Sequence, residues 1–231
     1  MINNKRVLAI TLARGGSSRI PKKNIVDING KPLLQYTIDE VKKSKYIDDY
    51  IVSTDDDSIH KVCSDLNTVS FSRKPASDTQ TTIDGIMEVI NFVENEGSSY
   101  DYIVEVMCTN PLKTIEDIDG VIEMLNENKS ESVVSVVRIW DTHPLRVKYL
   151  ENGKLKNFYG DENPDKPNSR RQDLTPPAYV RNGSIYAMTL KQLEQKSLRV
   201  DENTLAYIMP EERTINIDEP RDLELAKVLL K

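Results

Sequence analysis

The sequence is short of the residues that many kinds of site require. Its 231 residues include only two cysteines and two histidines. Cys63 and Cys108 lie far apart without the spacing of a metal site, and we interpret both as buried free thiols. We also find no Ser/His/Asp arrangement and no zinc spacing. These shortages argue against a disulfide scaffold and a zinc site, and they favour a reducing compartment.

Long apolar runs are missing as well. No stretch approaches the length needed to span a membrane, and no basic-then-apolar signal segment precedes Val7. We therefore expect a cytoplasmic protein with no membrane partner.

The formal net charge is −6, so a broad basic face of the kind that binds nucleic acid is not expected. The positive charge that does occur is concentrated in two short regions. The first holds Arg14, Arg19, Lys22, Lys23 and Lys31, and the second holds Lys166, Arg170, Arg171 and Arg181. Two local basic clusters on an acidic background predict two small anionic ligands, or two ends of one reaction.

Apolar, β-rich runs alternate with helical patterns along the chain. This alternation predicts an α/β fold with a doubly wound, mostly parallel sheet, and the length suits a single domain over residues 1–231. The expected strands are Val7–Ala13, Tyr50–Thr54, Tyr102–Cys108, Val133–Ile139, Ala178–Ala187, Leu205–Met209 and Thr214–Ile217. Helices are expected with Pro32 in a first turn, over Thr82–Glu96, after the capping-box-like Thr114–Asp117, and from Pro220.

Residues of about 141–177 break this pattern. The segment is rich in proline, asparagine and charge, with only a short strand-like stretch at Val147–Leu150. A compact domain rarely contains so long an irregular segment without a use for it. We expect it to leave the main body as an excursion.

The most informative segment, Arg14–Asn24, follows the first expected strand. Gly15 and Gly16 allow backbone N–H groups to approach an anion, and the neighbouring cations add charge-assisted donors. No Gly-Lys-Ser/Thr follows the glycines, so this is not a Walker A loop, and it is not a G-x-G-x-x-G fingerprint. The loop predicts a seat for a nucleotide triphosphate.

The elements Ala13-Arg14, Gly16-Ser17 and Pro21-Lys22-Lys23-Asn24 resemble the signature of the CMP-sialic acid synthetase (acylneuraminate cytidylyltransferase) family, which activates nine-carbon 2-keto sugar acids. Ser18 stands where the family usually has lysine. Further landmarks follow in family order, among them Thr109–Lys113, Arg171–Leu174 and Arg181–Tyr186. The resemblance implies a GT-A-like, Rossmann-related nucleotidyltransferase fold, CTP and a sugar acid as substrates, and a homodimer formed through residues 141–177.

The resemblance also implies roles for residues around the loop. Arg14 and Lys23 are expected to stabilise charge on the transferred phosphate, together with Asp218 as the third catalytic residue. For Lys22 an exposed turn is nearly as good an interpretation. The expected nucleotide-binding residues are Leu12, Ala13, Gly15, Gly16, Ser17, Asn24, Lys74 (or Arg73), Gln80 and Thr82.

A divalent cation, Mg²⁺ or Mn²⁺, is expected on the triphosphate. The family uses two acidic residues spaced by one on its last strand, which here correspond to Asn216 and Asp218. Alternation along a strand would place both side chains on one face. The alternative is that Asp218 simply begins the final helix.

The sugar acid carries a carboxylate, so its pocket requires a fixed cation. The expected sugar-binding residues are Met107, Thr109, Asn110, Lys113, Arg171, Arg181, Asn182 and, from a partner subunit, Arg146. Met107 stands where relatives that act on sialic acid carry an amide, which favours a deoxygenated acceptor such as legionaminic acid or a related 5,7-diamino sugar.

Other acceptors stay open, namely N-acetylneuraminic, pseudaminic or 3-deoxy-octulosonic acid. A noncatalytic nucleotide-binding regulatory domain is an alternative of another class, because Ser18 and Asn216 both depart from the family pattern.

Overall fold

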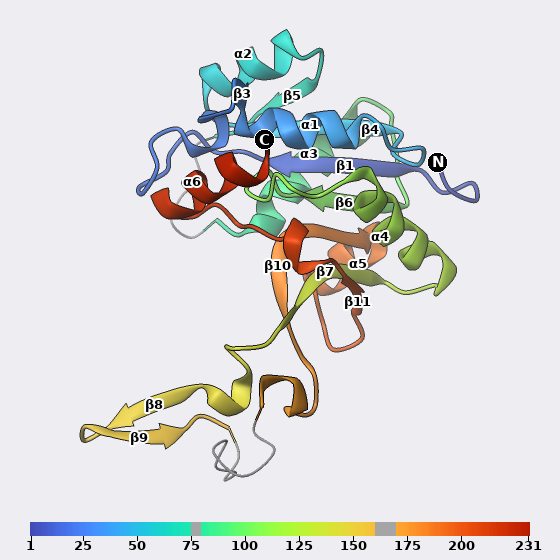
Figure 1. The fold of residues 1–231 in the computed structure, drawn as a ribbon. Coiled ribbons are helices and arrows are strands. Elements are labelled where there is room, and N and C mark those ends of the chain that lie inside the picture. The colour runs from blue at the N-terminus through green and yellow to red at the C-terminus, as the bar shows by residue number, and fades with distance from the viewer. Residues whose placement is uncertain (75–79, 160–169) are drawn as a thin grey trace.

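The computed structural model describes residues 1–74, 80–159 and 170–231. Its main feature is a seven-stranded sheet in the order β11-β7-β10-β6-β1-β4-β5 (Figure 1). The strands are β1 (Val7–Leu12), β4 (Asp49–Thr54), β5 (Val69–Ser72), β6 (Tyr102–Val106), β7 (Ser132–Ile139), β10 (Ala178–Thr189) and β11 (Leu205–Ile208).

Strand direction in the sheet is mostly parallel. β1 pairs in parallel with β4 and β6, β4 pairs in parallel with β5, and β11 pairs in parallel with β7. β10 is inserted between β6 and β7 and runs antiparallel to both. The predicted doubly wound, mostly parallel α/β fold is therefore confirmed.

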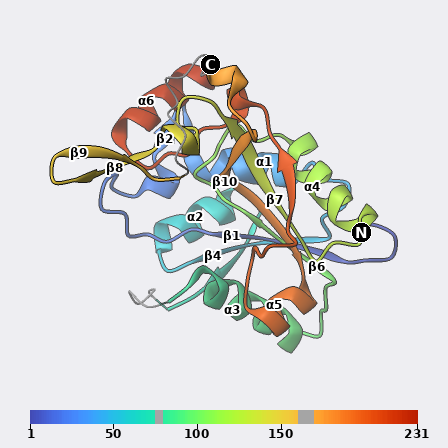
Figure 2. The same cartoon turned by 90° about the horizontal axis from the view of Figure 1, so that it is seen from below.

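Helices cover both faces of the sheet because the side chains of each strand alternate between two apolar cores. In β1, Val7 and Ala9 pack with α4, whereas Leu8 and Ile10 pack with α3 and α5. In Figure 2, α1 and α4 lie on one side of the strands and α3 and α5 on the other. The helices are α1 (Leu33–Val41), α2 (Asp57–Asp65), α3 (Thr82–Asn95), α4 (Ile115–Glu127), α5 (Leu190–Lys196) and α6 (Pro220–Leu229). Within the described ranges no helix is long and apolar enough to cross a membrane.

The helix starts follow from capping. Thr114 and Asp117 form the expected capping box of α4, and Thr81 forms one with Asp84 at the start of α3. Pro32 was expected inside the first turn of α1, but it lies immediately before that helix, where it pairs with Asp27 in the small β2–β3 hairpin (Asp27–Ile28 and Lys31–Pro32).

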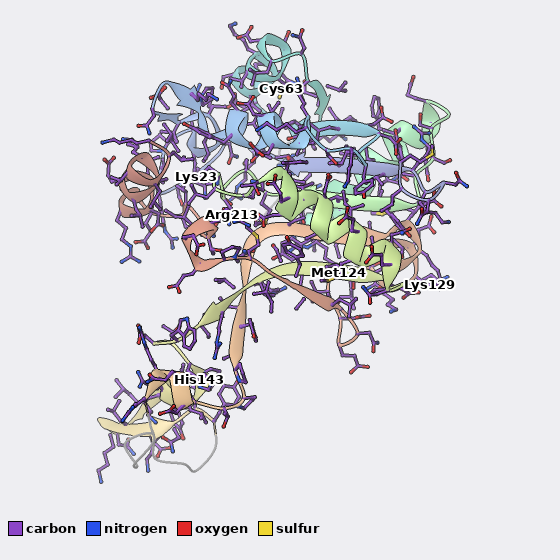
Figure 3. The ribbon with its side chains drawn as sticks, turned by 45° about the vertical axis from the view of Figure 1, so that its right-hand side comes forward. Lys23, Cys63, Met124, Lys129, His143 and Arg213 are labelled. Atoms are coloured by element: carbon purple, nitrogen blue, oxygen red, sulfur yellow. The ribbon has the colours of Figure 1, made fainter. Side chains whose placement is uncertain are left out.

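Between β7 and β10 the chain forms an arm that projects away from the sheet (Figure 1). Its hairpin consists of β8 (Lys148–Glu151) and β9 (Lys154–Asn157), joined by Asn152 and Gly153, which both have positive φ as a tight two-residue turn requires. His143, labelled in Figure 3, is buried, and its Nε2 lies 2.9 Å from the Pro176 carbonyl oxygen. This contact joins the outgoing and returning segments of the arm.

The prediction of a strand over Thr214–Ile217 is wrong. Residues 214–218 belong to no strand, since they lie outside the ladders of the sheet. The segment is tied to the chain after β6 by a backbone hydrogen bond from Ile217 N to Thr109 O, at 2.8 Å. It crosses the end of β6 rather than extending the sheet.

Candidate functional site

A cavity of about 400 Å³ opens where the chain leaves the carboxyl ends of β1 and β6. This is the edge at which open α/β sheets bind ligands. Most of the residues predicted for the nucleotide, the chemistry and the acceptor meet here: Leu12, Arg14, Gly16, Ser17, Lys23, Asn24, Gln80, Thr82, Met107, Thr109 and Asp218. Other residues of the lining are Ser18, Arg19, Arg73, Thr81, Glu105 and Cys108.

The glycine loop packs on the segment after β4 with one face and meets the cavity with the other. Gly15 N donates to Asp55 Oδ1 at 2.8 Å, so this amide is already used. A Cβ at Gly15 would lie 2.3 Å from Asp56 Oδ2, whereas a Cβ at Gly16 would meet nothing within 4 Å. Gly15 thus permits the close packing, and Gly16 with Ser17 forms the side of the loop that a ligand can approach.

Asn24 is buried and fixes the backbone of this loop by side-chain hydrogen bonds. Its Nδ2 donates to Arg14 O at 2.8 Å, and its Oδ1 accepts from the Cys108 thiol at 3.2 Å. Burial raises the pKa of Cys108 to about 11, so the thiol stays protonated and can donate. Asn24 therefore joins the end of β1 to the chain that follows β6.

Lys23 connects the loop to the far end of the chain. Its Nζ donates to Asp218 Oδ1 at 2.8 Å and to Ile217 O at 2.9 Å. Asp218 also accepts from Asn216 Nδ2, at 2.6 Å through Oδ2. Lys22 has a left-handed backbone with φ of 50° and reaches away toward Ser58. Of the two neighbouring lysines, only Lys23 faces the cavity.

Asp218 and Asn216 are suitable ligands for a hard cation. Both carry a side-chain oxygen; the Asp218 side chain is half exposed on the cavity wall, whereas Asn216 is outside the cavity lining. Within the described ranges no group of three or more His, Cys, Asp or Glu side chains forms a metal cluster. Such a pair fits Mg²⁺, which usually takes one or two carboxylates from the protein and its other ligands from phosphate and water.

The choice between Arg73 and Lys74 is decided by position. Arg73 lines the cavity, whereas Lys74 is exposed and does not. The buried Arg73 Nε has no hydrogen-bond partner among the described residues. Arg73 lies beside Gly85 of α3, where an added Cβ would be in ordinary contact with Arg73 Nη1 at 3.5 Å and closer to Leu12 Cδ1, at 3.2 Å. Arg73 thus brings a donor to the α3 side of the cavity.

Several residues predicted for the sugar do not line the cavity. Asn182 is buried in the sheet, where its Oδ1 accepts from Ser135 Oγ at 2.7 Å, and Asn110 is fully buried. Arg181 is exposed on β10. Arg146 and Arg171 lie in the arm, with guanidinium nitrogens 3.9 and 3.6 Å from the Asp141 carboxylate. Ala13, which was predicted to bind the nucleotide, also lies outside the cavity lining: it is buried, and its backbone N–H donates to Ser53 O.

Lys113 differs most from the expectation of an accessible cation. Its side chain is buried, and Nζ donates to Thr37 Oγ1 and Met107 O at 2.8 Å and to Asn110 O at 2.5 Å. Burial lowers its pKa to about 7. Lys113 therefore holds the backbone of the loop that carries Met107 and Thr109 by hydrogen bonds from inside the protein.

Glu105 is a charged lining residue that the sequence did not suggest for the site. It is the fourth of the five residues of β6, with 2% of its surface exposed, and its Oε2 accepts from Arg199 Nη1 at 2.5 Å. A single carboxylate inside the otherwise apolar run Tyr102–Val106 was the available signal, since such residues are seldom buried without a partner.

Comparison with known proteins gives consistent matches. Residues 8–228 match the protein-family model described as Cytidylyltransferase. The chain is 30% identical over 227 residues to pseudaminic acid cytidylyltransferase of Campylobacter jejuni, covering 97% of this chain and 96% of that protein. It is 29% identical over 235 residues to CMP-N,N'-diacetyllegionaminic acid synthase of Legionella pneumophila, covering 98% and 97%.

Among solved structures, CMP:2-keto-3-deoxy-manno-octonic acid synthetase complexed with CTP superposes with a TM-score of 0.71 at 18% identity, covering 97% of this chain and 98% of that one. A 4-diphosphocytidyl-2C-methyl-D-erythritol synthase superposes with a TM-score of 0.66 at 14% identity, covering 99% and 100%. At this identity the two structures support the fold alone.

The lowered pKa of Lys113 predicts a pH-dependent stability. Because its pKa is about 7 in the folded protein and 10.5 ordinarily, the unfolded chain binds more protons between these values. The free energy of unfolding should therefore rise with pH above about 7, by about 1.4 kcal/mol per pH unit, until the pH reaches the pKa of the unfolded chain. Lys113→Met should lose this rise and be destabilised, because Met107 O and Asn110 O lose their donor.

Urea unfolding of the native protein and of Lys113→Met between pH 6.5 and 9.5 measures this difference. The control is Lys61→Met, whose side chain is 73% exposed and should behave as the native protein does. Parallel pH profiles for the native protein and Lys113→Met would contradict the assignment.

Proposed function

The chain belongs to the cytidylyltransferase family, and we propose that it transfers CMP from CTP to the anomeric hydroxyl of a nine-carbon, 5,7-diamino 2-keto sugar acid, with release of pyrophosphate. Family membership makes it a nucleotidyltransferase, so the noncatalytic alternative is set aside. The observation that carries the proposal is one cavity with a basic glycine loop and Lys23–Asp218 on one side and Met107 on the other.

The loop side suits the triphosphate. Arg14 and Lys23 provide fixed positive charge where pyrophosphate would leave, and Gly16 and Ser17 provide a backbone amide and a hydroxyl. On the α3 side, Arg73, Gln80 and Thr82, with the backbone at Leu12, would form a polar rim for the cytosine edge, whereas Ala13 does not line the cavity. Lys74 is replaced by Arg73 in this assignment.

Asp218 and Asn216 would hold a Mg²⁺ or Mn²⁺ ion. Bound there, the ion would neutralise phosphate charge and orient the leaving group. The protein's own contribution is Lys23, whose ammonium fixes the Asp218 carboxylate by the 2.8 Å ion pair.

Met107 supports the choice of acceptor. Its side chain is half-buried in the cavity lining, and its backbone is fixed by a 2.9 Å hydrogen bond from Met107 N to Ser184 O. A thioether cannot satisfy a buried hydroxyl as an amide does, which favours a deoxygenated acid. Legionaminic acid is our first candidate. Pseudaminic acid is the second, because the relative with 30% identity bears that name. The two acids are stereoisomers with the same amino substituents, so Met107 does not separate them.

A second copy of the chain would bring the arm to the acceptor. The arm exposes large apolar side chains, with Leu150 at 73% and Leu155 at 72%, and such a patch usually marks an interface. Arg146 and Arg171 lie on the same arm. A homodimer in which these arginines reach the partner's cavity would provide the cation that the sugar carboxylate requires.

The transition-state role of Arg14 is tested by Arg14→Ala. Loss of a preorganised donor to the transferred phosphate should lower kcat by roughly a hundredfold or more, measured as pyrophosphate release. Arg221→Ala is the control, since that side chain is 83% exposed on α6. A change confined to KM would contradict the role.

The acceptor preference is tested with legionaminic, pseudaminic and N-acetylneuraminic acids at matched CTP and Mg²⁺. The diamino acids should be favoured in kcat/KM by about ten- to a hundredfold, the effect of one unpaired polar group. Met107→Gln should narrow the gap, whereas Met124→Gln on α4 should not. Equal or better turnover of N-acetylneuraminic acid by the native protein would refute this acceptor.

The dimer is tested by Leu150→Glu combined with Leu155→Glu. Charge on the apolar arm should shift light scattering to the monomer mass and raise the KM for the sugar acid while the KM for CTP changes little. The control is Val69→Glu, an exposed apolar residue on the distant edge strand β5. A native protein that is fully active as a monomer would refute the proposal.

A further inference from the structure

Glu105 carries a charge into the interior of the sheet. It lies on β6 on the same face as Met107, two residues nearer the strand's start, and pairs in register with Ile10 of β1 and Tyr186 of β10. The sheet face around it is apolar, with Ile10, Ile103 and Val136 in one core cluster. Placing a carboxylate there costs free energy unless the charge is paired, so a use for it is expected.

Arg199 provides the partner from the segment after α5. Its Nη1 donates to Glu105 Oε2, and its guanidinium stacks 4.4 Å from the centre of the Tyr186 ring. The guanidinium is held on two sides, which fixes the direction of the carboxylate. Glu105 Oε1 has no hydrogen-bond partner in the described part of the chain, while Glu105 itself lines the cavity. The carboxylate is therefore an oriented acceptor with one oxygen available to a ligand.

The strand order shows which lining residues lie near the Glu105 carboxylate. The basic loop follows β1, and Arg73 follows β5, two strands beyond β1. Glu105 lies on β6, on the other side of β1, and Arg199 comes from beyond β10. Glu105 thus lies beside Met107, on the β10 side of Leu12 and the basic loop, whereas Arg73 lies on the β5 side. An anionic side chain would also repel a triphosphate, which agrees with this placement.

We propose that Glu105 is a specificity-determining residue that accepts a hydrogen bond from an N–H or O–H donor on the sugar acid, and that Arg199 positions it. The inference rests on the proposed function, because it assumes a sugar acid at the Met107 side. Met107 disfavours a polar group of the sugar acid that would be left without a hydrogen bond. Glu105 favours an N–H or O–H group of the sugar acid nearby. Together they select an acceptor with one deoxygenated position and one donor-bearing substituent, such as an acylamino group.

The test uses steady-state kinetics of pyrophosphate release with the nine-carbon acid that the native protein turns over fastest among legionaminic, pseudaminic and N-acetylneuraminic acids. Glu105→Leu removes the acceptor and should raise the KM for the sugar acid about ten- to a hundredfold, with the KM for CTP within about twofold of the native value. Glu105→Gln keeps an acceptor oxygen and should have a smaller effect.

A double variant separates recognition from folding. Glu105→Leu alone leaves Arg199 without its carboxylate, whereas Glu105→Leu with Arg199→Met replaces the pair by apolar groups, a change that is often neutral for stability. The double variant should regain the native melting temperature but keep the raised KM for the sugar acid. Lys191→Met, on the exposed face of α5, is the kinetic control.

Each outcome has one meaning. A native-like sugar KM in the double variant, or a raised CTP KM in place of a raised sugar KM, would overturn the assignment of Glu105 and leave the proposed function intact. A native protein that releases no pyrophosphate with any of the three acids would overturn the proposed function and this inference with it.

Discussion

The site depends on the interaction of Lys23 with the segment before α6. The ammonium of Lys23 bonds to Asp218 and Ile217, which follow it by almost the whole length of the chain. Ile217 N also bonds to Thr109 O, so the same segment is tied to the loop after β6. The loop after β1, the loop after β6 and the final segment are thereby fixed at one edge of the sheet. These bonds hold Asp218 in the cavity lining.

Charged side chains of both signs lie around the cavity, on different elements. The protein has a formal net charge of −6, yet the loop that enters the cavity, Arg14–Asn24, carries cations and no acidic residue. Lys113 is buried beneath the cavity and clamps the backbone at Met107 and Asn110. The buried carboxylate of Glu105, balanced by Arg199, enters the cavity lining from β6. Under the proposed function, the basic loop would hold the anionic nucleotide and Glu105 would meet hydrogen-bond donors of the sugar acid.

Much of this arrangement was readable from the sequence, because apolar runs and capping residues act locally. β1, β4, β6 and β7 and the start of α4 follow from such signals. Edge strand β5 did not, since Val69–Ser72 is short and only partly buried. Lys113 was misassigned because its three acceptors come together only when α1 packs beside the loop after β6. Glu105 was overlooked because its partner Arg199 lies 94 residues away.

The central claim is that Lys23 and Asp218 act on the CTP phosphates as one unit. A double-mutant cycle on kcat for pyrophosphate release, with Lys23→Met, Asp218→Asn and the combined variant, measures this directly. Strong non-additivity is expected, with the combined variant little slower than the slower single variant. Losses that multiply would show instead that Lys23 and Asp218 act independently.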